Sequence, residues 1–204
     1  MFGKLAADAL GLSDIGSVIA PADYDKVDSD DYVMHEDQEK IFFLIKSKSD
    51  EYCFTNKALI HLDGTSAASK KRTLRRYTYS AHPVSNVMLE TAGNMDMDVE
   101  IKFHLGTKDF SIDVHKKHLE QVKDLYKALF RISELIRENE LMLGHAKTSV
   151  EVASATLGRG QAGATPTVEA FKELNQAAFL WLTGAQQKYH VKDFGSVFER
   201  YIKA

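Results

Sequence analysis

The sequence predicts an α+β protein in which a seven-stranded antiparallel β-barrel or sandwich is capped by a helix and followed by a helical tail. Two observations lead to this prediction. Residues 40–114 hold seven short β-like runs separated by turn residues, and from residue 116 onward the apolar spacing becomes helical. Strands that are short, closely spaced and joined by hairpins are typical of antiparallel sheets.

Length and composition limit the class of protein. The chain has 204 residues and a net charge of −3, so it can bury a substantial core but carries no overall basic field for nucleic acid. Its one cysteine, Cys53, excludes an intramolecular disulfide framework. No apolar run reaches the roughly 20 residues that span a bilayer, and Asp8 interrupts any secretory signal. We therefore expect a cytoplasmic protein that binds no nucleic acid.

Two segments precede the expected strands. Residues 1–21 place apolar side chains every three or four positions, which predicts a short amphipathic helix. Residues 22–40 form an acidic connector with eight carboxylates against two lysines. Charge of one sign at this density favours a solvated loop. A metal site there would lack the glycine that the EF-hand spacing requires.

The clearest strand is the run at 97–105. Val99, Ile101, Phe103 and Leu105 alternate with polar residues, as in a strand with one buried face. The next run repeats this alternation after a turn at Gly106, so the two predict a hairpin. The seven expected strands are 40–46, 51–55, 58–62, 72–79, 84–91, 97–105 and 109–114.

A long helix is predicted from residue 116 to residue 157. Apolar residues recur there at intervals of seven, and Leu119 and Tyr126 fill core positions between the first of them. Beyond Tyr126 those intermediate positions are polar, and Gly144 predicts a bend or break. The first half therefore packs on the barrel, and the second half faces partners of modest hydrophobicity.

The tail is expected to join one chain to another. A flexible linker at 158–167 precedes a helix at 168–189, capped by Thr167, and an apolar-faced segment at 191–202. A segment this small cannot bury so much apolar surface by itself, so it must pack either on the rest of the chain or on another subunit. A barrel already closed by a helix offers it little room, which favours a neighbouring chain. The expected interface residues are Phe171, Phe179, Trp181, Leu182, Phe194, Phe198 and Tyr201.

No group of residues with the spacing of a catalytic or metal site stands out. The letters GRGQAG at 158–163 follow a helix rather than a strand, so they indicate a linker and not a dinucleotide site. His115 and His118 lie three residues apart but lack a third ligand, and Cys53 lies between two aromatic residues in an alternating strand. We expect no enzyme, no cofactor and no metal.

One basic cluster remains as a candidate binding site. It has no acidic residue between Ser69 and Ser80, so it can bind phosphate groups, an anionic membrane or an acidic partner. It can equally be an exposed strand face that guards a sheet edge, or it can pair with the acidic connector. The cluster consists of Lys70, Lys71, Arg72, Arg75 and Arg76.

The motifs resemble the bacterial pleckstrin-homology (PH) family. Residues 52–60, YCFTNKALI, resemble its aromatic–x–Thr-Asn–Lys/Arg–x–Leu-Ile turn, and 70–79, 83–87 and 90–100 also match. The tail from about residue 149 is similar to the helical oligomerisation extension behind such domains. The resemblance implies a small helix-capped barrel assembled into homo-oligomeric rings, without known catalytic activity. It does not imply phosphoinositide binding, because Leu59 stands where the lipid-binding subset has arginine.

We therefore expect three parts: a helix at 1–21, a PH-like domain at 22–135 and an oligomerisation extension at 136–204. The leading hypothesis is a non-enzymatic, homo-oligomeric scaffold whose barrel presents a surface to a further protein. The alternative is a membrane-surface protein that binds anionic lipid through the first helix and the basic cluster. Lys4 is the only cation in residues 1–20, which disfavours that alternative.

Overall fold

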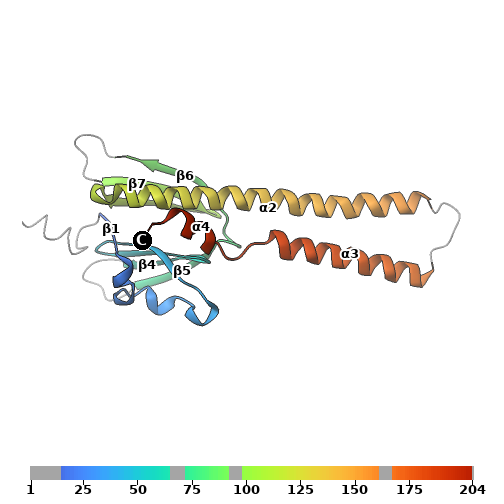
Figure 1. Ribbon diagram of the computed structural model, residues 1–204, viewed down its shortest axis with the longest axis horizontal. Coiled ribbons are helices and arrows are strands. Elements are labelled where there is room, and N and C mark those ends of the chain that lie inside the picture. The colour runs from blue at the N-terminus through green and yellow to red at the C-terminus, as the bar shows by residue number, and fades with distance from the viewer. Residues whose placement is uncertain (1–14, 65–71, 92–97, 161–166, 204) are drawn as a thin grey trace, which may run out of the picture. The chain divides into compact units, whose positions relative to one another are not determined.

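The computed structural model describes residues 15–64, 72–91, 98–160 and 167–203 (Figure 1). The chain divides into two compact units. Unit 1 contains the residues up to Glu134 and those from Lys192 onward, and unit 2 is Leu135–Val191. The chain thus leaves unit 1 after residue 134 and returns to it at residue 192.

Unit 1 is built on two antiparallel sheets. Its strands are β1 (Ser17–Val18), β2 (Ile41–Lys46), β3 (Asp50–Thr55), β4 (Ala58–Gly64), β5 (Arg72–Thr78), β6 (Val84–Glu90), β7 (Asp98–Leu105) and β8 (Lys108–His115). The first sheet has the order β1-β2-β3-β4-β5 and the second the order β6-β7-β8. All seven expected strands are therefore confirmed, and β1 is an additional short strand that the sequence did not indicate.

Aromatic side chains fill the space between the two sheets. Phe103 of β7 and Phe110 of β8 stack with ring centroids 5.2 Å apart. From the first sheet, Phe54 lies 5.9 Å from Phe103, and Tyr77 meets Phe110 edge-on at 5.2 Å. The apolar positions of β7 are all buried, as the alternation predicted. Gly106 makes the turn to β8 with φ of +60°, a conformation that favours glycine.

A helix and a short backbone bridge hold the two sheets together. The first turns of α2 (Leu119–Gly160) bury Val122 and Leu129 in unit 1, as the heptad spacing predicted, whereas the expected core residues Leu119 and Tyr126 are only half-buried. The other buried residues of this stripe, which that spacing did not predict, are Leu125, Ala128 and Ile132. Gly16 forms a parallel bridge with Val114 of β8, and a Cβ at Gly16 would lie 2.5 Å from Ile45 Cγ2. In the described ranges no ladder joins β5 to β6, so the architecture is a sandwich and not a closed barrel.

The predicted helix at 1–21 is corrected where the structure describes it. Its first 14 residues lie outside the described residues. Ser17 and Val18 form β1 and pair with Lys46 and Ile45 of β2, and Ile19 N–H donates to Leu44 O at 2.9 Å. Sheet pairing therefore replaces the helix in this stretch, because β2 offers an open edge that a local pattern cannot show.

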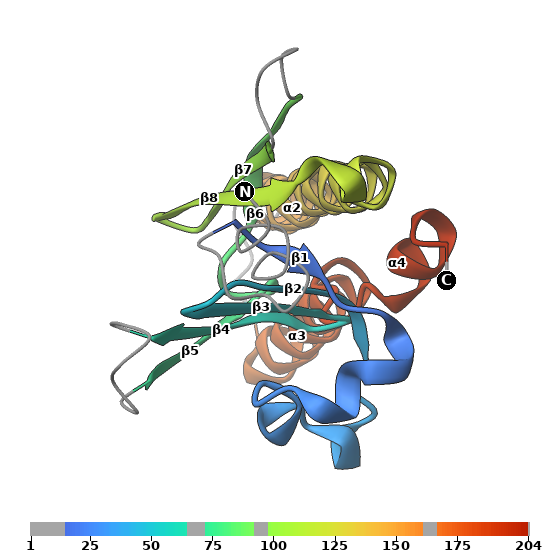
Figure 2. The same ribbon diagram turned by 90° about the vertical axis from the view of Figure 1, so that its left-hand side faces the viewer.

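The acidic connector covers the outer face of the first sheet. Val27 and Val33 are buried and pack against Leu44, Cys53 and Ile60. Figure 2 shows the connector on the side of this sheet that faces away from β7 and β8. The expected solvation is confirmed for most of the carboxylates, since five of the eight are exposed and only Glu39 is buried, but the segment is not a free loop, because apolar residues between the carboxylates pack on the sheet. The connector folds into three short 3-10 helices, η1 (Pro21–Lys26), η2 (Asp30–Tyr32) and η3 (His35–Asp37).

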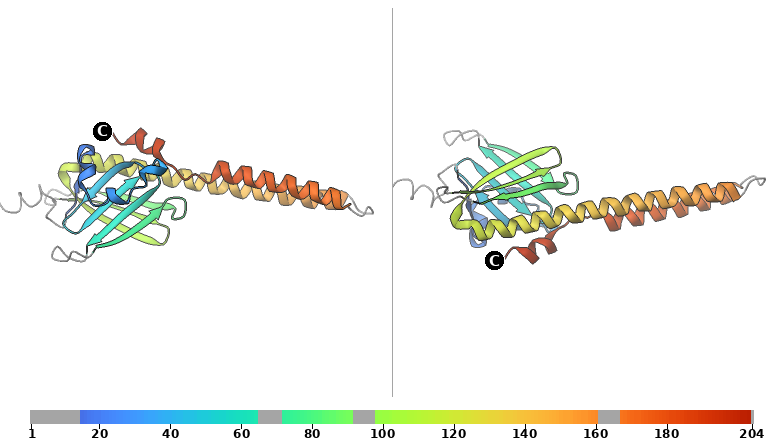
Figure 3. Two further views of the ribbon diagram at one scale, coloured as in Figure 1. Left: turned by 90° about the horizontal axis from the view of Figure 1, so that it is seen from below. Right: turned by 90° about the horizontal axis from the view of Figure 1, so that it is seen from above.

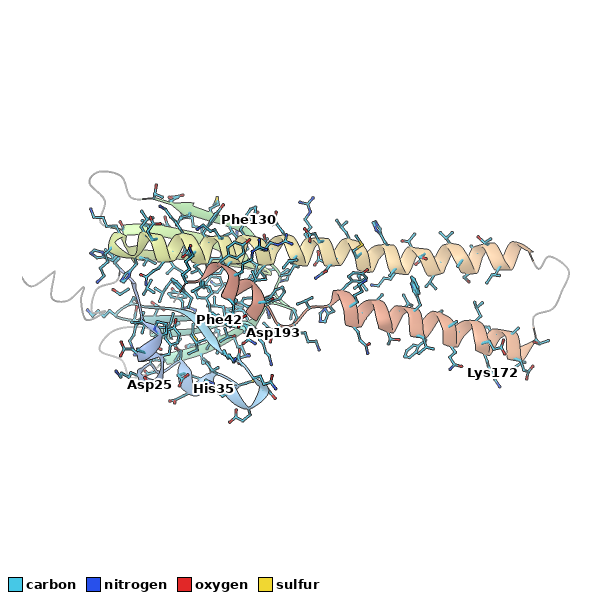
Figure 4. The ribbon with its side chains drawn as sticks, viewed as in Figure 1. Asp25, His35, Phe42, Phe130, Lys172 and Asp193 are labelled. Atoms are coloured by element: carbon cyan, nitrogen blue, oxygen red, sulfur yellow. The ribbon has the colours of Figure 1, made fainter. Side chains whose placement is uncertain are left out.

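The last helix, α4 (Gly195–Tyr201), completes the core of unit 1. Phe198 is fully buried and stacks on Phe42 of β2 with ring centroids 5.3 Å apart. Phe194 is 2% exposed and meets Tyr79 edge-on at 5.9 Å. Phe42 and Asp193 are both labelled beside α4 in Figure 4. This segment is distant in sequence from the strands but belongs to their core.

The positions of Phe194 and Phe198 correct the predicted interface between chains. Their own unit covers both rings, so neither is available on the surface. Phe194 N–H donates to Asn56 O at 2.8 Å, and Asn56 Nδ2 donates to Asp193 Oδ2 at 2.6 Å. The tail therefore does not form one continuous extension. The expected interface between chains rested on a sandwich whose apolar surface the first helix covers completely, whereas the sandwich keeps a site that α4 fills.

Unit 2 is a pair of helices that run side by side in the views of Figures 1 and 3. One is the second part of α2, and the other is α3 (Val168–Tyr189). The predicted Thr167 cap is confirmed, because its hydroxyl accepts from Ala170 N–H at 3.2 Å. The predicted break at Gly144 is wrong, because α2 continues through it. Neighbouring residues with good helix propensity outweigh one glycine there.

Candidate oligomerisation surface

The described part of the basic cluster is paired with carboxylates of its own chain. Lys70 and Lys71 lie outside the described residues. The cluster was expected to be an anion-binding site, an exposed strand face or a partner of the acidic connector. In the structure every described arginine of the cluster is paired within the chain, partly with the connector and partly with neighbouring strands. The ion pairs join Arg72 Nη1 to Asp28 Oδ2 (2.9 Å) and Glu51 Oε1 (3.3 Å), Arg75 Nη1 to Asp63 Oδ2 (2.9 Å), and Arg76 Nη2 to Glu39 Oε1 (2.7 Å).

Glu39 is a fully buried acceptor at the end of the connector. Burial alone would raise its pKa, but hydrogen bonds from Thr55 Oγ1 and Met34 N–H and the ion pair with Arg76 hold that pKa below its ordinary value. The carboxylate is therefore ionised at neutral pH. It ties the connector, β3 and β5 together, so Arg76 has a structural role.

Glu51, at the other end of β3, is a second buried carboxylate that joins the connector to the sheet. Its side chain is fully buried, and Lys46 Nζ donates to it at 2.6 Å while Ser29 N–H donates at 2.9 Å. Burial would raise its pKa, but these donors lower it. The two buried carboxylates explain why a segment rich in negative charge stays against the sheet.

The described residues with metal-binding or nucleophilic chemistry do not converge on a site. No group of three His, Cys, Asp or Glu that could hold a metal ion occurs in the described ranges. His115 instead caps the start of a short helix by accepting from Lys117 N–H at 3.1 Å. Cys53 is fully buried, and burial raises the pKa of its thiol to about 12. None of the described helices is both long and apolar enough to cross a bilayer.

Unit 2 exposes large apolar side chains along both of its helices. Phe171 and Phe179 of α3 are 66% and 65% exposed, and Trp181 is 56% exposed. No residue of α3 is buried. Of the other expected interface residues, Leu182 and Tyr201 are half-buried. Three of the seven expected residues are thus on the open surface.

Further exposed apolar residues of unit 2 were not among the expected ones. They continue the helical spacing of the two segments, which is the signal that could have identified them. The expected interface was confined to residues after the linker, most of them aromatic, and so did not include these side chains. They are Leu141, Met142, Val152, Leu157, Val168, Leu174 and Leu180.

Two open hollows lie along the seam between the helices of unit 2. Their volumes are about 560 Å³ and about 430 Å³, and Ser149 and Trp181 line both. Several of the residues that line the two hollows are small, including Ala146, Ala153 and Gly184. Trp181 Nε1 donates to Ala146 O at 3.2 Å, which fixes the indole while most of it stays exposed. Small residues beside a fixed aromatic ring make a groove that suits another helix.

Comparisons with known proteins assign the two ends of the chain separately. Residues 9–133 match the family model described as bacterial PH domain, and residues 144–204 match the YvbH-like oligomerisation region. The uncharacterised protein YvbH of Bacillus subtilis (strain 168) is 58% identical over 202 residues, covering 99% of each chain. A crystal structure of a PH-domain protein from Exiguobacterium sibiricum 255-15 has a TM-score of 0.83 at 53% identity, covering 93% of this chain and 100% of that one.

Proposed function

Because this chain belongs to the bacterial PH-domain family, we propose that it is a non-enzymatic, homo-oligomeric scaffold. In this proposal unit 2 joins copies of the chain, and unit 1 presents the sandwich to a further protein. The observation that carries the proposal is the exposed apolar surface of unit 2, within the region that matches an oligomerisation model.

Unit 2 cannot satisfy its apolar side chains alone. Two helices bury only the residues on their shared seam, and here even α3 has no buried residue. An exposed apolar patch of this kind marks an interaction surface in a soluble protein. Aromatic side chains such as Phe171, Phe179 and Trp181 contribute most to association because each buries a large area. A second copy of the same unit supplies matching apolar helices.

The distribution of exposed residues favours a ring over a simple dimer. Leu180 and Trp181 line the hollows, whereas the neighbouring Phe179 lines neither. Successive residues of a helix point about 100° apart, so Phe179 presents a second apolar side. A unit with two different apolar sides can contact two neighbours, and such head-to-tail contacts close into a ring when the rotation allows.

The role proposed for unit 1 is binding and not catalysis. Its two fully buried carboxylates in the described ranges, Glu39 and Glu51, are used in ion pairs that hold the fold. We place the scaffold in the cytoplasm, with no cofactor and no nucleic acid. The membrane alternative receives no support from Arg72, Arg75 or Arg76, since each of them already faces a carboxylate.

Light scattering coupled to size exclusion tests the assembly on the full chain. We expect the wild type to elute with a mass of several chains, and Phe171→Glu combined with Phe179→Glu to lower that mass toward one chain. The matched control is Gln176→Glu, which adds a carboxylate to an exposed α3 position that lines neither hollow. A monomeric wild type, or a double variant that keeps the wild-type mass, would contradict the proposal.

A further inference from the structure

The larger hollow of unit 2 holds a histidine among apolar side chains. His145 of α2 lines it together with Met142, Leu180 and Trp181, and Lys188 of α3 lines the same hollow. Both His145 and Lys188 are exposed in the single chain. Lys188 Nζ lies 5.1 Å from the ring centroid of Tyr189, which also lines the hollow. Two cation-forming side chains therefore share one apolar pocket.

Among the described residues that line the hollow, His145 has no anionic partner. Residues three and four positions away on α2 share its face, and they are Leu141, Met142, Thr148 and Ser149. On α3 the charged residue that lines the hollow is Lys188.

The other charged groups of α2 near His145 do not supply a close anionic partner either. Lys147, two positions along the helix, adds a further cation near His145. The carboxylate on the same face is that of Glu138, two helical turns or about 10 Å away along the axis, roughly one Debye length. An imidazolium at position 145 would therefore face cations at close range and have no carboxylate within one turn.

We propose that His145 makes the assembly of this protein sensitive to pH, because a second copy can cover the hollow only while the imidazole is neutral. This inference rests on the proposed function, since it concerns the surface through which copies associate. Covering the hollow removes water from the imidazole, and burying an unpaired cation beside Lys188 is strongly unfavourable. Assembly therefore opposes protonation of His145, and protonation opposes assembly by the same amount.

The sign and size of the effect follow from linkage. The separated chains bind more protons than the assembled chains, so assembly strengthens as pH rises and weakens as pH falls. Histidine is the side chain that changes its charge between about pH 5 and 8. Below the titration range of the imidazole, each further pH unit weakens the contact by about tenfold for each buried histidine.

We expect the rest of the chain to remain folded over this pH range. The buried carboxylates of Glu39 and Glu51 have lowered pKa values, so both stay ionised at pH 5.5 and keep their ion pairs. A change in mass at that pH therefore reports on association. Circular dichroism recorded on the same samples checks that the helical and strand content is unchanged.

The test is light scattering on the full chain at pH 7.5 and pH 5.5 over a dilution series, for wild type, His145→Gln, His145→Met and Lys188→Glu. The control is His104→Gln, a half-exposed histidine of β7 that pairs with Asp109 at 3.3 Å. We expect the wild type and the control to dissociate at pH 5.5 at concentrations where both variants at position 145 stay assembled. Lys188→Glu supplies the missing carboxylate, so its assembly should lose the acid sensitivity.

The outcomes separate this inference from the proposed function. A wild type that is monomeric at pH 7.5 overturns both. A wild type that is oligomeric to the same extent at both pH values, or more so at pH 5.5, overturns the role of His145 and leaves the scaffold intact. The inference is equally overturned if both position-145 variants dissociate at pH 5.5 as the wild type does, or if neither assembles at pH 7.5.

Discussion

Replacing Phe198 by alanine tests whether the end of the chain belongs to the core of unit 1. The ring is fully buried, and it lies 5.3 Å from Phe42 and 6.2 Å from Tyr79 by ring centroids. Truncating a buried phenylalanine costs about 3–5 kcal/mol of unfolding free energy, because transfer energy is lost and a cavity is left. The upper part of that range applies here, since α4 has only seven residues and little stability apart from its packing.

Hydrogen exchange followed by mass spectrometry measures this loss where it occurs. Peptides from β3, β4, β7 and β8 report the opening free energy of unit 1, separately from peptides of unit 2. A loss of about 4 kcal/mol should also lower Tm by about 10 °C or more. The matched control is Phe130→Ala on α2, because Phe130 is 45% exposed and its truncation should cost about 1 kcal/mol or less.

Two results would refute the reasoning. Equal effects of Phe198→Ala and Phe130→Ala would show that α4 is not part of the core. Deleting residues 192–204 should destabilise unit 1 at least as much as Phe198→Ala does, because Phe194 is lost as well. If the shortened chain kept the wild-type exchange pattern in its strands, the tail would not be needed to fold unit 1.

Three further predictions concern unit 1. Phe103→Ala should cost about 3–5 kcal/mol in urea unfolding, since the ring is buried between the sheets, and an unshifted transition would contradict its placement. Glu39→Gln should cost about 3 kcal/mol at pH 7 by leaving Arg76 unpaired. Because the pKa of Glu39 is lowered in the folded state, its stabilisation is present above about pH 4.5 and is lost as pH falls below that value, so the difference between wild type and variant in urea unfolding should shrink as the pH is lowered. Arg76→Glu should destabilise unit 1 strongly, whereas Arg75→Glu, at an exposed pair with Asp63, should change unfolding by about 1 kcal/mol or less; equal effects would contradict the burial of the Arg76 pair.

The distinction between Arg75 and Arg76 could not be made from the sequence. Both are basic residues of one strand, and adjacent residues of a strand point to opposite faces of its sheet. Which face is covered depends on the connector, whose Glu39 is 37 positions away in the chain. The notion of one basic patch followed from proximity in sequence, and the separate ion pairs follow from the register of β4 with β5.

The candidate oligomerisation surface was predicted in part for a related reason. Phe171, Phe179 and Trp181 were expected on the surface and are exposed there, because their helix has a partner on one side only. Phe194 and Phe198 carry the same apolar signal but are buried in unit 1. Composition and spacing indicate that a side chain needs to be covered. They do not say whether the cover comes from the same chain or from another.

The sequence by itself determined most of the strands and the long helices of this protein, because alternation along strands and heptad spacing along helices are local consequences of backbone geometry. It gave the seven strands, the capping helix and the helical pair of unit 2, together with the resemblance to the bacterial PH family. Only the tertiary structure decided what each free surface meets: β1 on the edge of β2, the connector on the outer face of the first sheet, and α4 against Phe42 and Tyr79. These contacts join residues far apart in the chain, and their stability comes from shape and burial that no local period records.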